Sequence, residues 1–240
     1  MHTNSGTASF RRDRLTGGEY PNPGFRIIDN VLWQEECEVI LRSLERSLVS
    51  RGRAGARHLL ADPNVGYLAR DPRLITLAAK ALGGKAVPFR ATLFEKSGKA
   101  NWLVVWHQDT ALPMSKRFEA SGWGPWSRKG GIRYAHAPAW ALARVVALRL
   151  HLDASTSENG PLRVVPDSHN LGVLTDEEIR SAVDQRGFFE CSVSKGGILV
   201  MRPLLIHSSS KALTDAPRRV LHFEYCDSLL LARSIELAVV

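Results

Sequence analysis

Cysteine is scarce in this sequence, and long apolar runs are absent. The three cysteines, Cys37, Cys191 and Cys226, are odd in number and far apart, which fits a reducing compartment better than a disulfide framework. No apolar run reaches the roughly 18–20 residues that a membrane-spanning helix needs. The first residues, MHTNSGTASFRRDRLTGG, contain no apolar stretch typical of a secretory signal. We therefore expect a cytoplasmic protein that makes no contact with a membrane.

Positive charge is in moderate excess but is not clustered. Lys and Arg total 32 against 24 Asp and Glu, which gives a formal net charge of +8. Such an excess could attract an anionic substrate or nucleic acid. The basic residues are spread along the chain, however, and form no run typical of nucleic-acid-binding tails. We expect a small-molecule substrate and no nucleic acid, and no pattern predicts an oligomeric state.

Length and composition are those of an ordinary globular domain. Apolar residues make up 44% of the 240 residues and charged residues 23%. The polar N-terminal stretch ends in the turn-rich run GGEYPNPG. We expect residues 1–20 to form a flexible tail and residues 21–240 to form a single domain.

The first part of that domain carries helical patterns, and the remainder carries strand patterns. Residues 31–48 repeat apolar side chains at spacings of three and four, and residues 71–84 begin with Asp-Pro and end with two glycines, so both predict helices. Residues 175–185, TDEEIRSAVDQ, begin with a capping box and predict a third. Short strand-like runs separated by turn residues are FRIID, VPFRATLFEK, WLVVWHQD, GIRYAHA, RVVALRLHLD, PLRVVPDS, FFECSV, GILVMRP and RRVLHFEY.

These patterns together predict the fold class. Many short strands without helices between them favour a mostly β protein with a jelly-roll-like double sheet, and the early helices would cover one face. Residues 111–136 carry glycines and two tryptophans, and we expect them to form a long loop of the kind that covers binding sites.

Histidine and aspartate occur together in the run VVWHQD. His107 and Asp109 are two residues apart, so on a strand their side chains would project from the same face. Two imidazoles and one carboxylate on one face of an octahedron form the site of non-haem Fe(II) oxygenases. The pattern alone is weak evidence, because a second histidine is needed. His207, at the end of the apolar run GILVMRPLLIH, is the best candidate.

Two arginines beyond His207 are candidates for binding a carboxylate. Arg218 and Arg219 begin the strand-like run RRVLHFEY and would point to opposite faces of a sheet. A buried guanidinium binds a carboxylate through two parallel hydrogen bonds. The apolar residues that alternate with both arginines leave the choice between them open.

Four motifs occur in a characteristic order: WHQD, then RLHLD with NGPLRVVPDSH, then GGILVMRPLLIHSSS, and then RRVLHFEY. Over residues 88–226 the chain resembles the phytanoyl-CoA dioxygenase family of Fe(II)- and 2-oxoglutarate-dependent oxygenases. The resemblance implies a double-stranded β-helix (jelly-roll, cupin-like) core with flanking N-terminal α-helices. It also implies O2-dependent hydroxylation of a substrate C–H bond, with release of succinate and CO2.

The same resemblance implies roles for individual residues. His107, Asp109 and His207 would bind Fe(II), and Arg218 would bind the distal carboxylate of 2-oxoglutarate. Arg149 and Ser209 lie where side chains contact the cosubstrate in relatives. Asp167 departs from the family, since a glycine is usual in its turn, although aspartate also suits turns.

Other residues near these motifs have weaker assignments. Trp123, Trp126 and His136 lie in or next to the expected loop and could contact substrate, although tryptophans more often pack in the core. Two other functions fit parts of the pattern. One is a nucleic-acid oxidative demethylase that uses the basic surface, and the other is a jelly-roll binding module that has lost catalysis.

Overall fold

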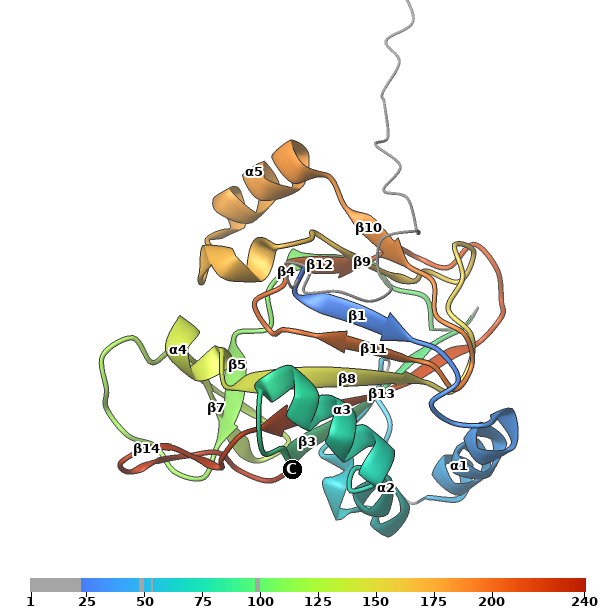
Figure 1. The fold of residues 1–240 in the computed structure, drawn as a ribbon, viewed down its shortest axis with the longest axis horizontal. Helices are drawn as coiled ribbons and strands as arrows, with labels where there is room; N and C mark the ends of the chain where they lie inside the picture. Colours follow the sequence, from blue (N-terminus) through green and yellow to red (C-terminus); the bar gives the residue numbers. More distant parts are fainter. Residues whose placement is uncertain (1–22, 48–49, 53, 98–99) are drawn as a thin grey trace, which may run out of the picture.

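The computed structural model describes residues 23–47, 50–52, 54–97 and 100–240 (Figure 1). The expected N-terminal tail, residues 1–20, lies outside the described residues. Within the described part of the chain, no helix has both the length and the apolar character that a bilayer crossing requires.

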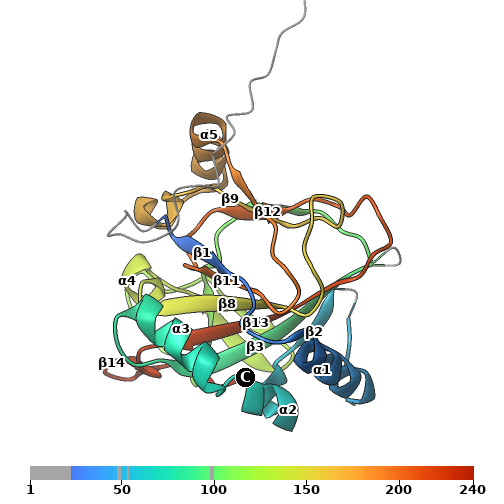
Figure 2. The same ribbon diagram turned by 45° about the vertical axis from the view of Figure 1, so that its right-hand side comes forward.

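Two antiparallel sheets form the core, as the jelly-roll prediction required. Figure 2 shows the smaller sheet lying across from the larger one. The six-stranded sheet has the order β1 (Phe25–Ile28), β11 (Ile198–Met201), β8 (Val145–His151), β13 (Arg218–Cys226), β3 (Val87–Lys96) and β2 (Gly55–Arg57). The four-stranded sheet has the order β10 (Phe189–Cys191), β9 (Leu162–Val164), β12 (His207–Ser209) and β4 (Val104–His107).

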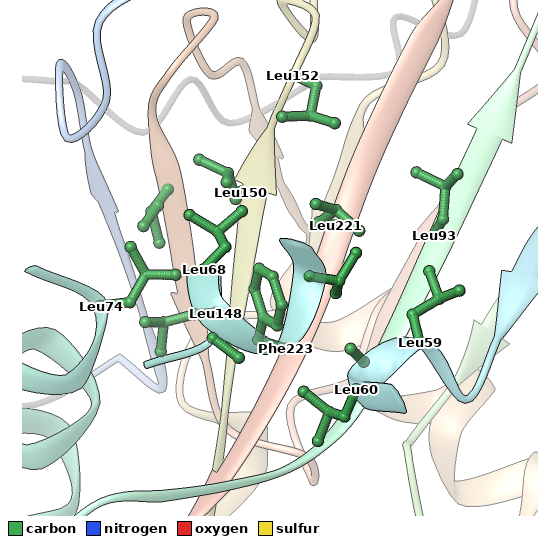
Figure 3. Packing of buried hydrophobic residues seen from close by; sticks show 14 of the residues in the cluster. Leu59, Leu60, Leu68, Leu74, Leu93, Leu148, Leu150, Leu152, Leu221 and Phe223 are labelled. Atoms are coloured by element: carbon green, nitrogen blue, oxygen red, sulfur yellow. The ribbon is translucent and has the colours of Figure 1, made fainter. Parts of the chain in front are cut away.

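Helices cover the outer face of the larger sheet: α1 (Gln34–Arg46), α2 (Pro63–Leu68) and α3 (Pro72–Leu82) (Figure 1). α3 begins and ends as its sequence predicts, because Asp71 accepts a hydrogen bond from the Arg73 backbone N–H and Gly83 adopts a left-handed conformation with φ of 76°. Figure 3 shows Leu68 and Leu74 packed toward Leu148 and Leu150 of the sheet. The strands predicted from sequence over β1, β3, β4, β7 to β11 and β13 are all present.

Alternation along β13 separates an apolar outer face from a polar inner face. Leu221 and Phe223 belong to the hydrophobic cluster beneath the helices. Arg218, His222 and Glu224 have the opposite parity and are nevertheless buried. The larger sheet therefore places ionisable side chains in the space that it shares with the smaller sheet.

The prediction that residues 111–136 form a long loop is wrong for about half of the segment. This region forms a three-stranded sheet of β5 (Ala111–Met114), β7 (Ile132–His136) and β6 (Trp126–Lys129). β6 and β7 contain exposed basic residues, and the strands have only four or five residues, so their alternation is too short and too polar to stand out. The short elements α4 (Ala139–Leu142), β14 (Leu230–Ala232) and β15 (Ile235–Glu236) lie nearby in a shared hydrophobic cluster.

Outside the smaller sheet lies α5 (Asp176–Arg186), which begins at Thr175 with the predicted capping box. Its buried Ile179 packs with Val165 and Ile206, which adjoin β9 and β12. Two 3-10 turns, η2 (Leu59–Ala61) and η3 (Ser168–Leu171), complete the described elements. The helix and η3 thereby support the strand on which His207 lies.

Candidate metal centre

Two histidines from distant parts of the chain face each other across the smaller sheet. His107 ends β4 and His207 begins β12, and the register of the two strands pairs these residues directly. Their ring centroids are 4.2 Å apart. The Asp109 carboxylate lies 3.8 Å from Nε2 of His107 and 3.5 Å from Nε2 of His207. One donor atom from each residue lies within 4.8 Å of the others, so the three side chains could hold one metal ion.

Backbone carbonyls orient both imidazoles. Nδ1 of His107 lies 2.8 Å from the Val105 carbonyl oxygen, and Nδ1 of His207 lies 2.9 Å from the Leu205 carbonyl oxygen. A neutral imidazole that donates from Nδ1 keeps the lone pair of Nε2 for a metal, and such carbonyl contacts are usual for metal-binding histidines. In both residues it is therefore Nε2 that faces Asp109.

Asp109 lies beyond the end of β4 and is positioned by hydrogen bonds of its own backbone and of the neighbouring Gln108. β4 ends at His107, so the alternation that the sequence suggested does not extend to Asp109. The Asp109 backbone N–H donates to the Pro203 carbonyl at 2.9 Å. The buried amide of Gln108 donates to the carbonyls of Gly172 and Leu204 and accepts from the Leu174 N–H, each at 2.8 or 2.9 Å. These bonds fix the chain just beyond the strand.

The protonation states of the cluster suit metal binding. Burial lowers the pKa of His207 to about 4, so its ring is neutral at pH 7. Burial alone would raise the pKa of Asp109, but the neighbouring His207 and His107 outweigh it and hold that pKa below its usual range. A neutral imidazole and an ionised carboxylate are the forms that bind a metal cation.

Two buried arginines lie on the larger sheet, Arg218 on β13 and Arg149 on β8, and Arg218 reaches Ser209 of β12. Arg218 is 3% exposed. Its Nε and Nη1 have no hydrogen-bond partner among the described residues, while Nη2 is 3.4 Å from Ser209 Oγ. Arg149 is also buried; within the described part of the chain its Nε has no partner, and its Nη1 donates to His222 Nδ1 at 3.0 Å. Burial lowers the pKa of Arg218 to about 9 and that of Arg149 to about 10. Buried donors without a partner could bind an anion at this position.

Arg219 lies on the opposite face of the larger sheet. Its Nε and Nη2 donate to the Asp153 carboxylate at 2.7 and 2.9 Å, and its Nη1 is 3.5 Å from Glu45 of α1. The two candidate arginines therefore differ in position. Arg218 points into the interior between the sheets, whereas Arg219 forms structural ion pairs on the other face.

The three predicted substrate contacts have different surroundings. His136 is exposed, and its Nδ1 is 2.6 Å from the hydroxyl of Thr110, which follows Asp109. Trp123 and Trp126 pack edge-on against Phe118 in a hydrophobic cluster, each with 5.1 Å between ring centroids. The two tryptophans therefore contribute to packing in the region of the three-stranded sheet.

The unusual aspartate of the PDSH turn has a structural explanation. Asp167 has φ of 63°, in the left-handed region that a glycine adopts without strain and that aspartate tolerates better than most residues. The next residue, Ser168, accepts a hydrogen bond from the Ile206 N–H at 2.8 Å. The turn therefore supports the residue before His207 despite its departure from the family pattern.

Two buried polar residues near the site were not found from the sequence. Gln108 was assigned no role, and Lys96 was passed over within the strand VPFRATLFEK. Lys96 is 1% exposed, directly opposite Arg218 in the register of β3 and β13. Its parity along β3 differs from that of the core residues Ala91 and Leu93, which was a usable signal.

Comparison with known sequences supports one family. The profile described as phytanoyl-CoA dioxygenase (PhyH) matches residues 20–220. L-proline trans-4-hydroxylase from Streptomyces griseoviridis is 28% identical over 149 residues, covering 62% of this chain and 46% of the relative. Ectoine dioxygenase from Halomonas elongata is 23% identical over 86% of this chain and 67% of the relative. The chain thus spans about half to two thirds of the length of these curated relatives.

Solved structures share the fold. EctD from S. alaskensis, with 2-oxoglutarate and 5-hydroxyectoine, has a TM-score of 0.66 at 18% identity, covering 91% of this chain and 82% of that one. HygX from Streptomyces hygroscopicus, with nickel, 2-oxoglutarate and hygromycin B, has a TM-score of 0.61 at 20% identity, covering 86% and 84%. With a double-sheet fold and a profile match across most of its length, the chain belongs to the phytanoyl-CoA dioxygenase family.

Proposed function

We propose that this protein is an Fe(II)- and 2-oxoglutarate-dependent dioxygenase that hydroxylates a C–H bond of a small organic substrate. The observation that carries the proposal is the convergence of His107, Asp109 and His207, with both Nδ1 atoms bound to backbone carbonyls. This donor set is that of non-haem Fe(II) sites that keep coordination positions open. His107, Asp109 and His207 would hold the iron.

The interior arginine supports the cosubstrate assignment. Arg218 reaches Ser209, two residues along β12 from His207, which corresponds to about 6.6 Å of strand. A five-carbon diacid could span that distance from the metal cluster to the guanidinium. Arg218 would bind its distal carboxylate through Nε and Nη1, to which no described residue is hydrogen-bonded, and the buried Arg149 would add positive charge beside it.

Bound iron would supply the oxidation chemistry, in which O2 and 2-oxoglutarate yield succinate, CO2 and a hydroxylated substrate. The protein's own residues would position the diacid and the metal ligands, and would protect the reacting groups from water. Arg218 would fix the orientation of the diacid, and the carbonyls of Val105 and Leu205 would keep both imidazoles aligned. Burial of His207 and of the arginines would limit the access of water to the reacting groups.

A cavity next to β3 suits a small substrate. It measures about 460 Å³ and is lined by Thr92 and Phe94 of β3 together with His58 and Gly130. Phe94 also contacts His222 and Arg149 on the inner face of the larger sheet. Drug-sized and smaller ligands occupy cavities of this size. The named relatives act on an amino acid and on ectoine, which are also small molecules. Apart from the residues that line this cavity, we propose His136 as a substrate contact, because its Nδ1 lies 2.6 Å from the hydroxyl of Thr110, the residue after Asp109.

Succinate formation tests the proposed activity. Purified protein supplied with Fe(II), ascorbate, O2 and 2-oxoglutarate should form succinate, and candidate small molecules should accelerate it. D109A should remove this turnover and the binding of Fe(II), while D184A, an exposed aspartate on α5, should retain both. Equal turnover in D109A and the wild type would contradict the proposal.

We also propose a cytoplasmic location and a single domain over residues 21–240. Three cysteines that are buried and unpaired support a reducing compartment. Hydrophobic clusters that join the helices to the larger sheet, and the larger sheet to the smaller one, support the single domain.

A further inference from the structure

Two basic segments meet at the edge of the proposed substrate cavity. Arg57 ends β2 and is followed by His58, and Lys129 ends β6 and is followed by Gly130. The cavity is lined by Arg57, His58 and Gly130, and Arg57 is directly opposite the cavity residue Thr92 in the register of β2 and β3. A Cβ atom at Gly130 would lie 3.0 Å from Cε1 of His58, so the turn after β6 lies against the imidazole ring. The larger sheet and the three-stranded sheet therefore bring Arg57 and Lys129 to one basic edge of the cavity.

Tyr134 of β7 connects the two segments. Its hydroxyl oxygen lies 2.9 Å from Nε2 of His58, and its ring centroid lies 5.1 Å from Nζ of Lys129. The Tyr134 side chain is buried, whereas Lys129 is exposed. His58 has φ of 61°, a left-handed conformation that costs energy in residues other than glycine and recurs at ligand-binding sites. The contacts with Tyr134 thus fix the imidazole in the cavity wall and the ammonium group beside it.

The basic edge lies close to the candidate metal centre. Partial desolvation lowers the pKa of Lys129, the charges of Arg57 and Arg90 lower it further, and the charge of Asp109 opposes them. Coulomb interactions weaken with distance, so these charged groups are near neighbours. A molecule bound at the basic edge would therefore have only a short distance to span to the proposed metal ligand Asp109.

No carboxylate neutralises the basic edge. Glu224 forms an ion pair with the neighbouring Arg90. Among the described residues, however, none of the ion pairs includes Arg57 or Lys129. The described residues that line the cavity include no aspartate and no glutamate. Two neighbouring cations without a counter-charge attract an anion, and guanidinium and ammonium groups both bind carboxylate and phosphate oxygens.

We propose that the substrate is a small organic anion whose carboxylate or phosphate group is bound between Arg57 and Lys129. The rest of the molecule would occupy the cavity beside Thr92 and Phe94 of β3. The inference rests on the proposed function and names the substrate class of that site. A solvated basic edge that contacts no ligand is the alternative that the experiment must separate.

Paramagnetic relaxation of matched probes tests the inference without turnover, with Mn(II) in place of Fe(II) and with saturating 2-oxoglutarate. Benzoate, cyclopentanecarboxylate and phenyl phosphate are compared with their uncharged counterparts benzamide, cyclopentanecarboxamide and phenol. At least one anionic probe should bind at least about tenfold more tightly than its counterpart, because the uncharged form lacks a charge-assisted hydrogen bond. The carboxylate and phosphate pairs separate the two kinds of anion. Equal affinities, or no binding, in all three pairs overturn the inference.

Variants on one strand separate binding at the basic edge from a general attraction of anions. Lys129 and Arg128 are adjacent and exposed on β6, and their side chains point to opposite faces. K129M and R57M should each reduce the preference for the anionic probe to less than about threefold, whereas R128M, with the same loss of charge, should keep it. Equal effects of K129M and R128M overturn the inference. A wild-type protein that neither binds 2-oxoglutarate nor forms succinate contradicts the proposed function itself, whereas an active wild type without a preference for anionic probes contradicts only the substrate class.

Discussion

Replacement of Arg218 and Arg219 by methionine should have opposite consequences. Arg218 is buried; in the part of the chain that the structure describes, two of its nitrogens have no partner, and Nη2 is 3.4 Å from Ser209 Oγ. An unsatisfied buried donor costs about 1–3 kcal/mol, so R218M should leave the ligand-free protein at least as stable as the wild type. Arg219 makes two bonds of 2.7 and 2.9 Å to Asp153 while remaining partly exposed. R219M should therefore cost about 1–2 kcal/mol of unfolding free energy.

Binding of 2-oxoglutarate should reverse that order. Two charge-assisted bonds from Arg218 to a carboxylate are worth about 3–6 kcal/mol, so R218M should raise the dissociation constant by a factor of about 10² to 10⁴. R219M should leave it near the wild-type value. Thermal unfolding with and without 2-oxoglutarate measures both effects, and R219M should lower the melting temperature of the ligand-free protein by about 2–8 °C. A ligand-induced shift that survives in R218M but disappears in R219M would refute the assignment.

Three further predictions concern the support of the site and the response of the fold to pH. Q108A removes three buried hydrogen bonds, so it should lower the unfolding free energy by about 2–4 kcal/mol and weaken Fe(II) binding, measured by urea denaturation and metal titration. D167G should stabilise the protein slightly and D167A should destabilise it, because φ is 63°; equal melting temperatures for the two variants would contradict this reasoning. Burial holds the pKa of His151 well below 6.5, so the unfolded chain takes up a proton there before the folded one. Stability should be fully present above pH 6.5 and should fall by about 1.4 kcal/mol per pH unit below it, a slope that H151Q should reduce.

The elements predicted correctly from the sequence are those whose strand or helix pattern extends over enough residues to be recognised. β8 has seven residues and β13 has nine, and both show strand patterns bounded by turns. α3 has cap residues at both ends. By contrast, β12 consists of His-Ser-Ser, three polar residues without an apolar pattern, and its burial comes from pairing with β9 and β4. Elements of this kind depend on tertiary contacts that a local pattern does not contain.

The candidate metal ligands can be predicted from the sequence because their residue types are themselves typical of metal sites. Histidine and aspartate are uncommon in strand-like segments, so the run WHQD and the isolated His207 stood out. Their direct pairing depends on the register between β4 and β12, which are separated by about a hundred residues of sequence. Lys96 and Gln108 did not stand out, because a single lysine or glutamine in a sequence resembles an ordinary surface residue. Lys96 can be assigned to the interior only from the alternation of side chains along β3, once it is known that Ala91 and Leu93 face the helices.

The positions of the buried cations matter more for function than the net charge of the chain. A net charge of +8 does not say where the charges lie, and Lys96, Arg149 and Arg218 are buried between the two sheets. Their mutual repulsion and lost hydration oppose folding of the empty protein, as their lowered pKa values indicate. An anion bound among them would offset this cost, so we expect binding of the proposed cosubstrate to stabilise the fold. At a concentration of one hundred times its dissociation constant, a ligand that binds only the folded state adds about 2.7 kcal/mol of stability. For 2-oxoglutarate that gain should depend on Arg218, because its buried Nε and Nη1, which have no hydrogen-bond partner among the described residues, would gain one only when the carboxylate is bound.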